Sequence, residues 1–245
     1  MSKFNKVALV TGASRGIGAS IAKRLAKDGF AVVVNYAGRE DAAKEVVNHI
    51  TQSGGIALPY QADVSDAVLV QAMFDHVEST LGKVDVLVNN AGVMELKPLA
   101  KADIQHVDKQ IDINLKGTIN TMREASTRLN KGGRVINFSS SVVGLKLENY
   151  GVYAATKAAV ETLTAIMAKE MRGKNITVNA VAPGPTATEL FLKGKSDELV
   201  ERMAKMSPLE RIGTPDDIAS VVSFLANPDS GWVNGQVLRA NGGVI

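Results

Sequence analysis

The stretch that decides the fold is "KVALVTGASRGIGASIAKRLAKDGFAVVVNY", residues 6–36. It opens with an apolar run typical of a buried strand and passes through a glycine loop into a segment with helical periodicity. Ile21, Ala22 and Leu25 lie on one stripe of that helix, and Gly29 ends it before a second apolar run. A strand, a helix and a strand in succession predict a βαβ unit, and therefore a parallel sheet.

The same alternation continues to the end of the chain. Five more runs of strand length are expected over residues 56–63, 84–92, 133–140, 176–184 and 235–243. Helical patterns occupy residues 39–55, 65–82 (with Ser65 as a plausible cap), 103–129 (one or two helices), 153–173, 197–206 and 215–227. The strands are continuous apolar runs, as expected for strands that are covered on both faces. We predict an α/β fold: a single Rossmann-type domain over residues 1–245, with a doubly wound parallel sheet and helices on both faces.

Composition narrows the class of protein. The 245 residues include 28 Lys and Arg against 25 Asp and Glu, and the net charge of +3 is too small and scattered to indicate a nucleic-acid partner. The chain has no cysteine, which excludes disulfides and thiolate metal sites. Apolar runs such as 7–10 and 31–34 are far shorter than the ~18 residues of a membrane span, and the start does not resemble a signal peptide. We therefore expect a cytoplasmic protein with no membrane partner.

The glycine loop predicts a nucleotide site. Gly12, Gly16 and Gly18 fall between the first strand and the first helix, where backbone N–H groups and the helix dipole favour a pyrophosphate. Their spacing departs from the G-x-G-x-x-G fingerprint, so in isolation an ordinary glycine turn would explain them equally well. Their place at the first βα turn of an alternating chain favours nucleotide binding.

The end of the second strand indicates which dinucleotide is bound. A carboxylate ~20 residues beyond the loop would accept the ribose hydroxyls of NAD. Asn35 and Tyr36 occupy that region instead, and the first acidic residues come at 40–41. Arg15 and Arg39 flank the region as partners for a phosphate, which predicts NADP(H). The alternative is that both arginines are only solvated.

Polar turns follow the next two strands. Asp63 ends the third strand and Asn90, Ala91 and Gly92 end the fourth. Such turns can satisfy the backbone without a ligand. Since the carboxyl ends of parallel strands share one edge of the sheet, we expect them to hold adenine and ribose there.

Tyr153 and Lys157 lie four residues apart, which places them on the same face of a helix. A nearby ammonium would lower the pKa of the tyrosine from ~10 toward a range useful for acid–base chemistry. An ordinary amphipathic helix also explains the spacing, but the preceding strand ends in hydroxyls at the carboxyl edge of the sheet. His49, His76 and His106 share no metal-ligand spacing and are expected on the surface. We expect no metal site and no Ser-His-Asp mechanism.

Together these residues resemble the short-chain dehydrogenase/reductase (SDR) family, especially its branch of 3-oxoacyl-acyl-carrier-protein reductases and glucose dehydrogenases. The match covers nearly the whole chain. Its motifs are, in family order, "TGASRGIG" (11–18), "NNAG" (89–92), "INLKG" (113–117), "INFSS" (136–140), "YAATK" (153–157) and "NAVAPGPTAT" (179–188). The resemblance implies a sheet of about seven strands and hydride transfer between a nicotinamide and a carbonyl or secondary alcohol.

The resemblance also assigns roles to four residues. Tyr153 matches the general acid/base, and Lys157 matches the residue that lowers its pKa and holds the nicotinamide ribose. Asn114 matches a residue that helps a water relay protons to the lysine. Ser140 matches the hydroxyl that orients the substrate carbonyl, although Ser141 aligns better if the residues after it are taken as the anchor.

The resemblance implies a long cofactor site, a substrate lid and an oligomer. The expected cofactor residues are Gly12, Ser14, Arg15, Gly16, Ile17, Gly18, Asn35, Tyr36, Ala37, Arg39, Asp63, Val64, Asn90, Ala91, Gly92, Tyr153, Lys157, Pro183, Gly184, Thr186 and Thr188. The variable lid corresponds to residues 189–206, whose apolar residues either line a substrate pocket or fold the lid onto the body. Family members are commonly tetramers, so we expect a homotetramer.

The function that follows is an NADP-dependent oxidoreductase acting on a small-molecule carbonyl or alcohol. One alternative is a 3-oxoacyl-acyl-carrier-protein reductase in particular. A second, from another class, is a non-catalytic NADP-binding sensor.

Overall fold

The computed structural model describes residues 6–245 and contains a seven-stranded parallel sheet in the order β3-β2-β1-β4-β5-β6-β7. The strands are β1 (Val7–Val10), β2 (Ala31–Tyr36), β3 (Ile56–Gln61), β4 (Val84–Asn89), β5 (Arg134–Phe138), β6 (Thr177–Pro183) and β7 (Val237–Ala240). The strand order reverses direction between β1 and β4, as in doubly wound sheets. The α/β fold and the Rossmann-type parallel sheet predicted from the sequence are confirmed.

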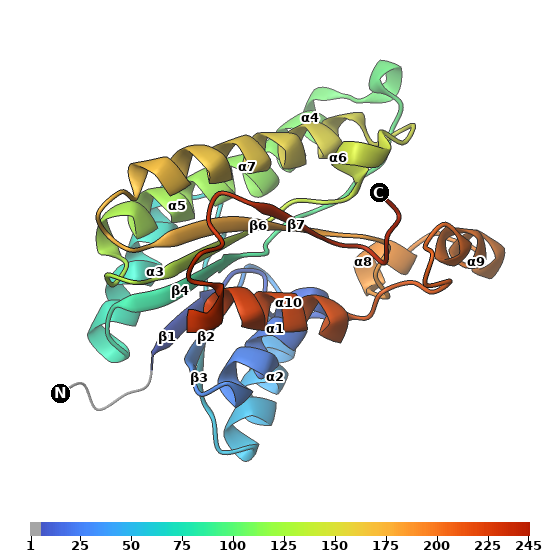
Figure 1. The fold of residues 1–245 in the computed structure, drawn as a ribbon. Helices are drawn as coiled ribbons and strands as arrows, with labels where there is room; N and C mark the ends of the chain where they lie inside the picture. Colours follow the sequence, from blue (N-terminus) through green and yellow to red (C-terminus); the bar gives the residue numbers. More distant parts are fainter. Residues whose placement is uncertain (1–5) are drawn as a thin grey trace.

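Helices cover both faces of the sheet (Figure 1). One layer holds α1 (Gly16–Lys27), α2 (Glu40–Gln52) and α10 (Pro215–Ala226), and the other holds α3 (Ala67–Thr80), α5 (Gly117–Arg128) and α7 (Gly151–Glu170). The shorter helices are η1 (Leu99–Lys101), α4 (Ile104–Gln110), η2 (Ile111–Lys116), α6 (Val142–Leu145), α8 (Glu189–Leu192), α9 (Asp197–Lys205) and η3 (Pro228–Ser230).

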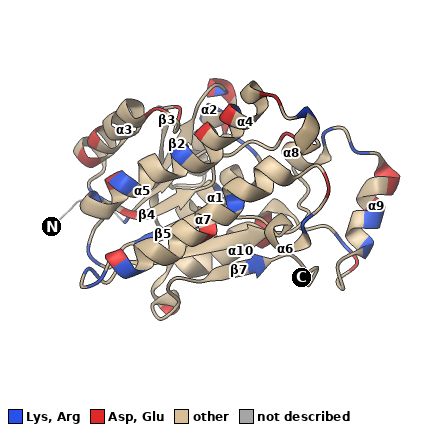
Figure 2. Cartoon of the chain, turned by 90° about the horizontal axis from the view of Figure 1, so that it is seen from above, with Lys and Arg blue, Asp and Glu red and all other residues tan. Residues whose placement is uncertain are grey.

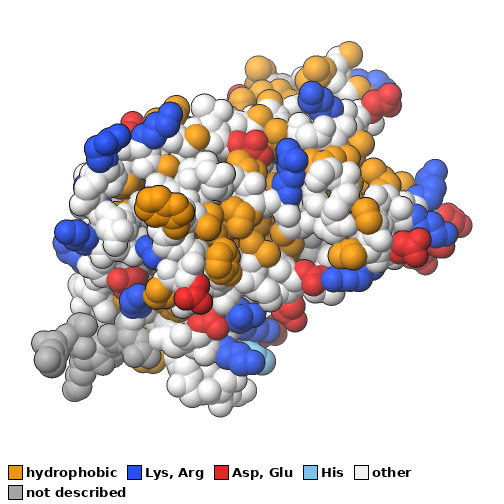
Figure 3. Space-filling model, in the orientation of Figure 1, with side chains coloured by type: hydrophobic (Ala, Val, Ile, Leu, Met, Phe, Trp, Pro, Cys, Tyr) orange, Lys and Arg blue, Asp and Glu red, His pale blue; other side chains and the backbone are white. Residues whose placement is uncertain are grey.

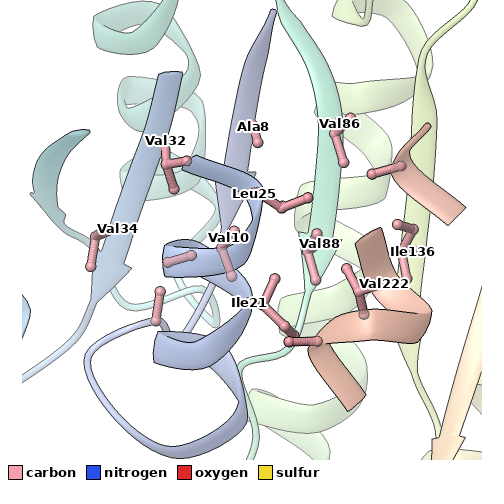
Figure 4. Packing of buried hydrophobic residues seen from close by; sticks show 14 of the residues in the cluster. Ala8, Val10, Ile21, Leu25, Val32, Val34, Val86, Val88, Ile136 and Val222 are labelled. Carbon is pink, nitrogen blue, oxygen red and sulfur yellow. The ribbon is translucent and has the colours of Figure 1, made fainter. Parts of the chain in front are cut away.

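Each central strand contributes to two hydrophobic cores, because successive side chains point to opposite faces of the sheet. In β1, Ala8 and Val10 pack under α1 and α10, while Val7 and Leu9 pack under α3 and α5. Figure 4 shows the first of these cores, in which side chains of α1 and α10 lie over the strands. These cores hold the carboxyl ends of the strands in one row.

Residues 104–128 form one continuous helical segment, where the sequence left open one helix or two. It runs through α4, the π-helical η2 and α5. The wider π turn contains Asn114, whose side chain is fully buried. Single π turns inside helices are often found at functional sites.

Three local predictions need correction. α1 begins at Gly16, within the glycine loop, rather than after the loop. Asp66, not Ser65, caps α3, because its carboxylate accepts from the N–H groups of two residues in the first turn. His106 is only 3% exposed and lies against Gln110, so its position on the surface was wrongly predicted.

Charged residues of both signs are interspersed along the outer helices, including α9 (Figure 2). Hydrophobic side chains gather on the face shown in Figure 3, over the region of β7. Among residues 6–245, no helix combines the length and the apolar character needed to cross a bilayer.

Candidate active site

The glycine loop lies against the turn after β4, at the carboxyl edge of the sheet. The Thr11 hydroxyl accepts from the backbone N–H groups of Asn90 and Ala91, at 3.0 Å each. The Asn90 amide donates to the carbonyls of Thr11 and Gly12, at 2.9 and 3.0 Å. These bonds fix two polar turns, far apart in sequence, as one surface.

Two glycines in this loop leave no room for a side chain. Gly12 has φ +61°, and a Cβ there would lie 2.8 Å from Ala91 Cα. A Cβ on Gly18 would overlap the Gly12 carbonyl oxygen and lie 2.5 Å from the Asn90 amide nitrogen. The start of α1 therefore presents bare backbone to the cleft, as close approach of a pyrophosphate requires.

Asn35 supports the glycine loop from below. Its carboxamide accepts from Gly12 N and donates to the carbonyls of Tyr60 and Ala62, and the side chain is 1% exposed. The sequence predicted that Asn35 binds the cofactor. The structure shows that its polar atoms bind the backbone, so its effect on a ligand passes through the loop.

Nearly all of the predicted site residues line one cleft, which has two adjoining halves. The cofactor half is lined by Gly12, Ser14, Arg15, Gly16, Ile17, Gly18, Asn35, Tyr36, Ala37, Arg39, Asp63, Val64, Asn90, Ala91, Gly92 and Thr188. The substrate half is lined by Ser140, Tyr153, Lys157, Pro183, Gly184, Thr186 and Thr188. Ile17, Asn90, Gly92 and Thr188 border both halves. Asn114 alone lines neither half.

Asn114 lies directly behind the cleft. Its Oδ1 accepts from Val93 N at 2.8 Å, and its Nδ2 donates to Val93 O at 2.9 Å. A Cβ on Gly92 would lie 3.2 Å from Asn114 Oδ1 and 3.6 Å from Lys157 Nζ. Asn114 therefore holds the loop after β4 close to the lysine.

Tyr153 and Lys157 lie on the same face of α7, as their spacing predicted. Lys157 is 4% exposed, and its Nζ donates to Phe138 O at 2.9 Å and lies 5.7 Å from the centre of the Tyr153 ring. Burial lowers the pKa of Lys157 to about 8. Burial also raises the pKa of Tyr153 to about 12, and the Ser140 hydroxyl opposes that rise.

The direction of the tyrosine shift differs from the sequence prediction. A lowered pKa was expected from the neighbouring ammonium, but loss of water around the phenol outweighs other effects in this structure. Tyr153 is consequently a protonated hydroxyl, able to donate, throughout the physiological pH range.

The three serines after β5 have different partners. Ser139 Oγ donates to Glu161 Oε1 at 2.6 Å. Ser141 Oγ donates to Ala182 O and accepts from Asn241 Nδ2, at 3.3 and 3.0 Å. Ser140, which is half-buried, is the serine whose hydroxyl affects Tyr153. This arrangement favours Ser140 over Ser141 as the residue that faces a substrate.

Arg15 and Arg39, on which the NADP prediction rests, both line the cofactor half of the cleft. Arg15 Nη1 is 2.8 Å from Glu189 Oε2. Arg39 binds the same carboxylate with two bonds of 3.1 Å. The guanidinium of Arg39, followed by that of Arg15, holds the pKa of Glu189 below its ordinary value.

The residues that sequence reasoning missed lie mostly in loops. In the cofactor half they are Gly38, Ala62, Val93, Ile113 and Glu189. In the substrate half they include Met94, Val142, Leu145, Leu147, Tyr150 and Pro185. The only signal for them is position, since they follow strand ends that already carry motifs. Of the apolar lid residues, Leu190, Phe191 and Met203 line the cleft, whereas Leu192 lies outside it.

The glycine cradle fits a dinucleotide, and the arginine pair fits an additional phosphate on it. The residues described by the structure contain no group of three or more His, Asp or Glu side chains placed to hold a metal ion. A doubly wound sheet with this cradle and an adjoining Ser-Tyr-Lys group defines a dinucleotide-binding oxidoreductase.

Comparison with known proteins agrees with this class. The family described as Enoyl-(Acyl carrier protein) reductase matches residues 12–245. A short-chain type dehydrogenase/reductase of Picea abies is 44% identical over 250 residues, covering 98% of this chain and 92% of the relative. The 3-oxoacyl-[acyl-carrier-protein] reductase FabG of Staphylococcus aureus is 44% identical and covers 99% of both chains.

A solved structure extends the agreement to three dimensions. A short chain dehydrogenase from Burkholderia cenocepacia in complex with NADP has a TM-score of 0.93 and 34% identity, covering 100% of this chain and 99% of that one. The chain belongs to the short-chain dehydrogenase/reductase family and is an oxidoreductase of that family.

Proposed function

We propose that the protein is an NADP-dependent reductase of carbonyl compounds, with Tyr153 as the proton donor. The observation that carries this proposal is the Ser140, Tyr153 and Lys157 group, which lines the cleft where it adjoins the glycine cradle. NADPH, when bound, supplies the hydride.

The side chains divide the remaining work. The Ser140 hydroxyl donates to the substrate carbonyl oxygen and holds it beside Tyr153. Tyr153, whose pKa is raised to about 12, carries the proton that the oxygen needs as it becomes an alcohol. Lys157, with its pKa lowered to about 8, is mostly an ammonium at neutral pH and stabilises the phenolate left behind. Asn114, through Val93 and the neighbouring Gly92, positions the loop beside that ammonium, where a water relay to the lysine would pass.

Replacement of Tyr153 by phenylalanine tests the proposal. Loss of a general acid reduces kcat by about 10²- to 10⁴-fold, and because the ring is retained the fold should stay intact. NADPH oxidation with a panel of ketones and aldehydes, followed by absorbance, gives the rate, while calorimetric titration with NADPH shows that binding is retained. Tyr150→Phe is the matched control, because Tyr150 lines the same half of the cleft and its ring packs edge-on against Tyr153. Full activity of Tyr153→Phe would overturn the proposal, and a wild type without any turnover would favour the sensor.

The proposed preference for NADP rests on Arg15 and Arg39. A phosphate monoester between two guanidinium groups gains charge-assisted bonds that NADH cannot form. Arg39→Gln should weaken NADPH about 10- to 100-fold and leave NADH almost unchanged, as measured by titration calorimetry. Arg24→Gln, on α1 but outside the cleft, where its side chain bonds Asp28 and Ser220, is the control.

A 3-oxoacyl thioester reductase is the second candidate. The substrate half of the cleft supports it through apolar residues such as Met94, Leu147 and Met203, which suit an acyl chain. The name of the FabG relative points the same way. Comparing kcat/KM for acetoacetyl-coenzyme A with that for free ketones of equal chain length decides between the two.

We also propose a homotetramer, supported by exposed hydrophobic residues on two separate faces. One lies on the outside of α5 and α7, with Ile119 and Ile166 at 41% and 47% exposed. The other lies around α10 and β7, where Phe224 is 42% and Trp232 99% exposed. Such residues are common at subunit contacts. Light scattering after size exclusion should give four subunits for the wild type and two for Trp232→Ser with Phe224→Ser, and a monomeric wild type would refute the assembly.

A further inference from the structure

Glu189 spans the cofactor half of the cleft and binds both arginines that are expected to hold a phosphate. Arg39 holds its two carboxylate oxygens in a forked pair, at 3.1 Å each, and Arg15 binds Oε2 at 2.8 Å. Arg15 directly precedes α1, Arg39 directly precedes α2, and Glu189 begins α8. The carboxylate therefore joins the base of the lid to the two loops on the opposite side of the cleft.

The guanidinium donors used by this carboxylate are those that a phosphate monoester would use. Forked pairing with a planar guanidinium suits carboxylate and phosphate alike. A phosphate dianion that enters between the arginines meets a carboxylate already there, so the two anions compete and repel each other. The side chains of Arg15, Arg39 and Glu189 are about half exposed, at 48%, 55% and 57%. Ion pairs as exposed as these are weak, so the carboxylate can be displaced.

The neighbours of Glu189 in the chain connect this displacement of the carboxylate by a phosphate to the substrate half of the cleft. Thr188 packs on the glycine loop, where a Cβ on Gly16 would lie 3.4 Å from Thr188 Cγ2. Leu190 borders both halves of the cleft. The bridge between Thr186 and Gly213 closes the base of the lid just outside these residues. Glu189 thus lies in the chain between two residues, Thr188 and Leu190, that line the substrate half.

We propose that Glu189 is a specificity-determining residue that competes with the 2′-phosphate of NADP for Arg15 and Arg39. When the phosphate binds, Glu189 leaves the arginines and frees the base of the lid. NADH, which has no such phosphate, leaves the ion pairs in place. The inference rests on the proposed NADP preference. Its consequence is that Glu189 weakens NADPH binding and so moderates the preference for NADP over NAD.

Calorimetric titration of Glu189→Gln with NADPH and with NADH tests the inference. Removal of the competing charge should tighten NADPH about two- to fivefold and change NADH by less than about twofold. Glu198→Gln is the matched control: it removes one negative charge from the lid, and Glu198 forms no ion pair within residues 6–245. Hydrogen exchange of residues 189–193 should rise in Glu189→Gln without ligand, and Glu198→Gln should leave it at the wild-type value.

A triple variant, together with the single variants, separates failure of this inference from failure of the proposed cofactor. In an Arg15→Gln, Arg39→Gln background, Glu189→Gln should no longer change NADPH affinity. If Arg39→Gln lowers the preference for NADPH but Glu189→Gln leaves it at the wild-type value or reduces it, Glu189 does not compete and this inference fails alone. If Arg39→Gln leaves the preference unchanged, the arginines do not hold a phosphate and both proposals fail.

Discussion

The floor of the cofactor half and the lid over the substrate half are held in different ways. The floor is fixed by partly buried hydrogen bonds between strand ends, such as those from Asn90 and Asn35 to the glycine loop. In the segment 187–213, Ser207 alone is buried, and α8 and α9 contain no buried residue. The floor is thus held by hydrogen bonds and close packing around Gly12 and Gly18, whereas the lid is held at its base and by surface ion pairs.

This contrast predicts where substitutions are tolerated. The floor of the cofactor half must present bare backbone to a phosphate. An extra methyl group there would displace neighbouring atoms that are already held by hydrogen bonds. An exposed lid can change side chains with small effects on stability, and so can diverge in substrate choice. Three substitutions test this contrast between floor and lid, and they are described in order of decreasing expected effect.

Gly18→Ala should have the largest effect on cofactor binding. Its Cβ would overlap the Gly12 carbonyl oxygen and press on Asn90, and both are held by other bonds. Overpacking of this kind destabilises by about 1–3 kcal/mol, and the displaced loop should weaken NADPH about a hundredfold. Thermal unfolding and calorimetric titration measure the two effects.

Gly38→Ala is the control for that variant. Gly38 lines the same half of the cleft, but a Cβ there would meet no atom within 4 Å. It should bind NADPH as the wild type does. Equal behaviour of the two alanine variants would show that the floor is not constrained as described.

Lys157→Met should raise the stability of the protein without ligand while abolishing its activity. The pKa of Lys157 is lowered to about 8 from 10.5, so folding at neutral pH carries a penalty of up to about 3 kcal/mol for a buried ammonium. Lys157→Met removes this penalty but also loses the hydrogen bond to Phe138 O, which costs about 1 kcal/mol. The free energy of unfolding should therefore rise by about 2 kcal/mol.

The pH dependence of this gain has a definite sign. Between pH 8 and 10.5 the unfolded lysine keeps its proton and the folded one has lost it, so the stability of the wild type rises with pH. The advantage of Lys157→Met should therefore be full below about pH 7 and nearly absent by about pH 10. Urea unfolding at several pH values measures it, and a gain that is constant with pH would contradict the explanation.

The sequence predicted the floor far better than the lid, for a physical reason. The floor is encoded by local patterns, each compatible with few conformations. These are the strand ends, the glycines at 12 and 18, and the spacing of Tyr153 and Lys157. The role of Asn35 and the burial of His106 depend on packing between distant elements, and no local pattern carries that information. The Glu189 contacts join residues 150 and 174 positions apart, so only the structure could bring them together.

The pKa of Tyr153 shows the same limit of prediction from local sequence, here for a single hydroxyl group. Spacing alone predicted the effect of a neighbouring ammonium, but the extent of burial decided the direction. Burial is a property of the completed fold, since helices α6 and α7 and the lid all contribute residues to that half of the cleft.

Phe191→Ala should have the smallest effect, and that effect should be limited to KM for the substrate. Phe191 lines the substrate half from α8 and lies outside the cofactor half. Truncation of a half-buried aromatic ring should raise KM for an apolar ketone by about five- to tenfold, or about 1 kcal/mol, with kcat and NADPH affinity within about twofold of the wild type. Leu192→Ala, on the same short helix but outside the cleft, provides the control for a general effect on the lid. Steady-state kinetics with saturating NADPH separates KM from kcat. A matching loss of NADPH affinity would show that lid and floor act as one rigid unit, and the contrast between them would fail.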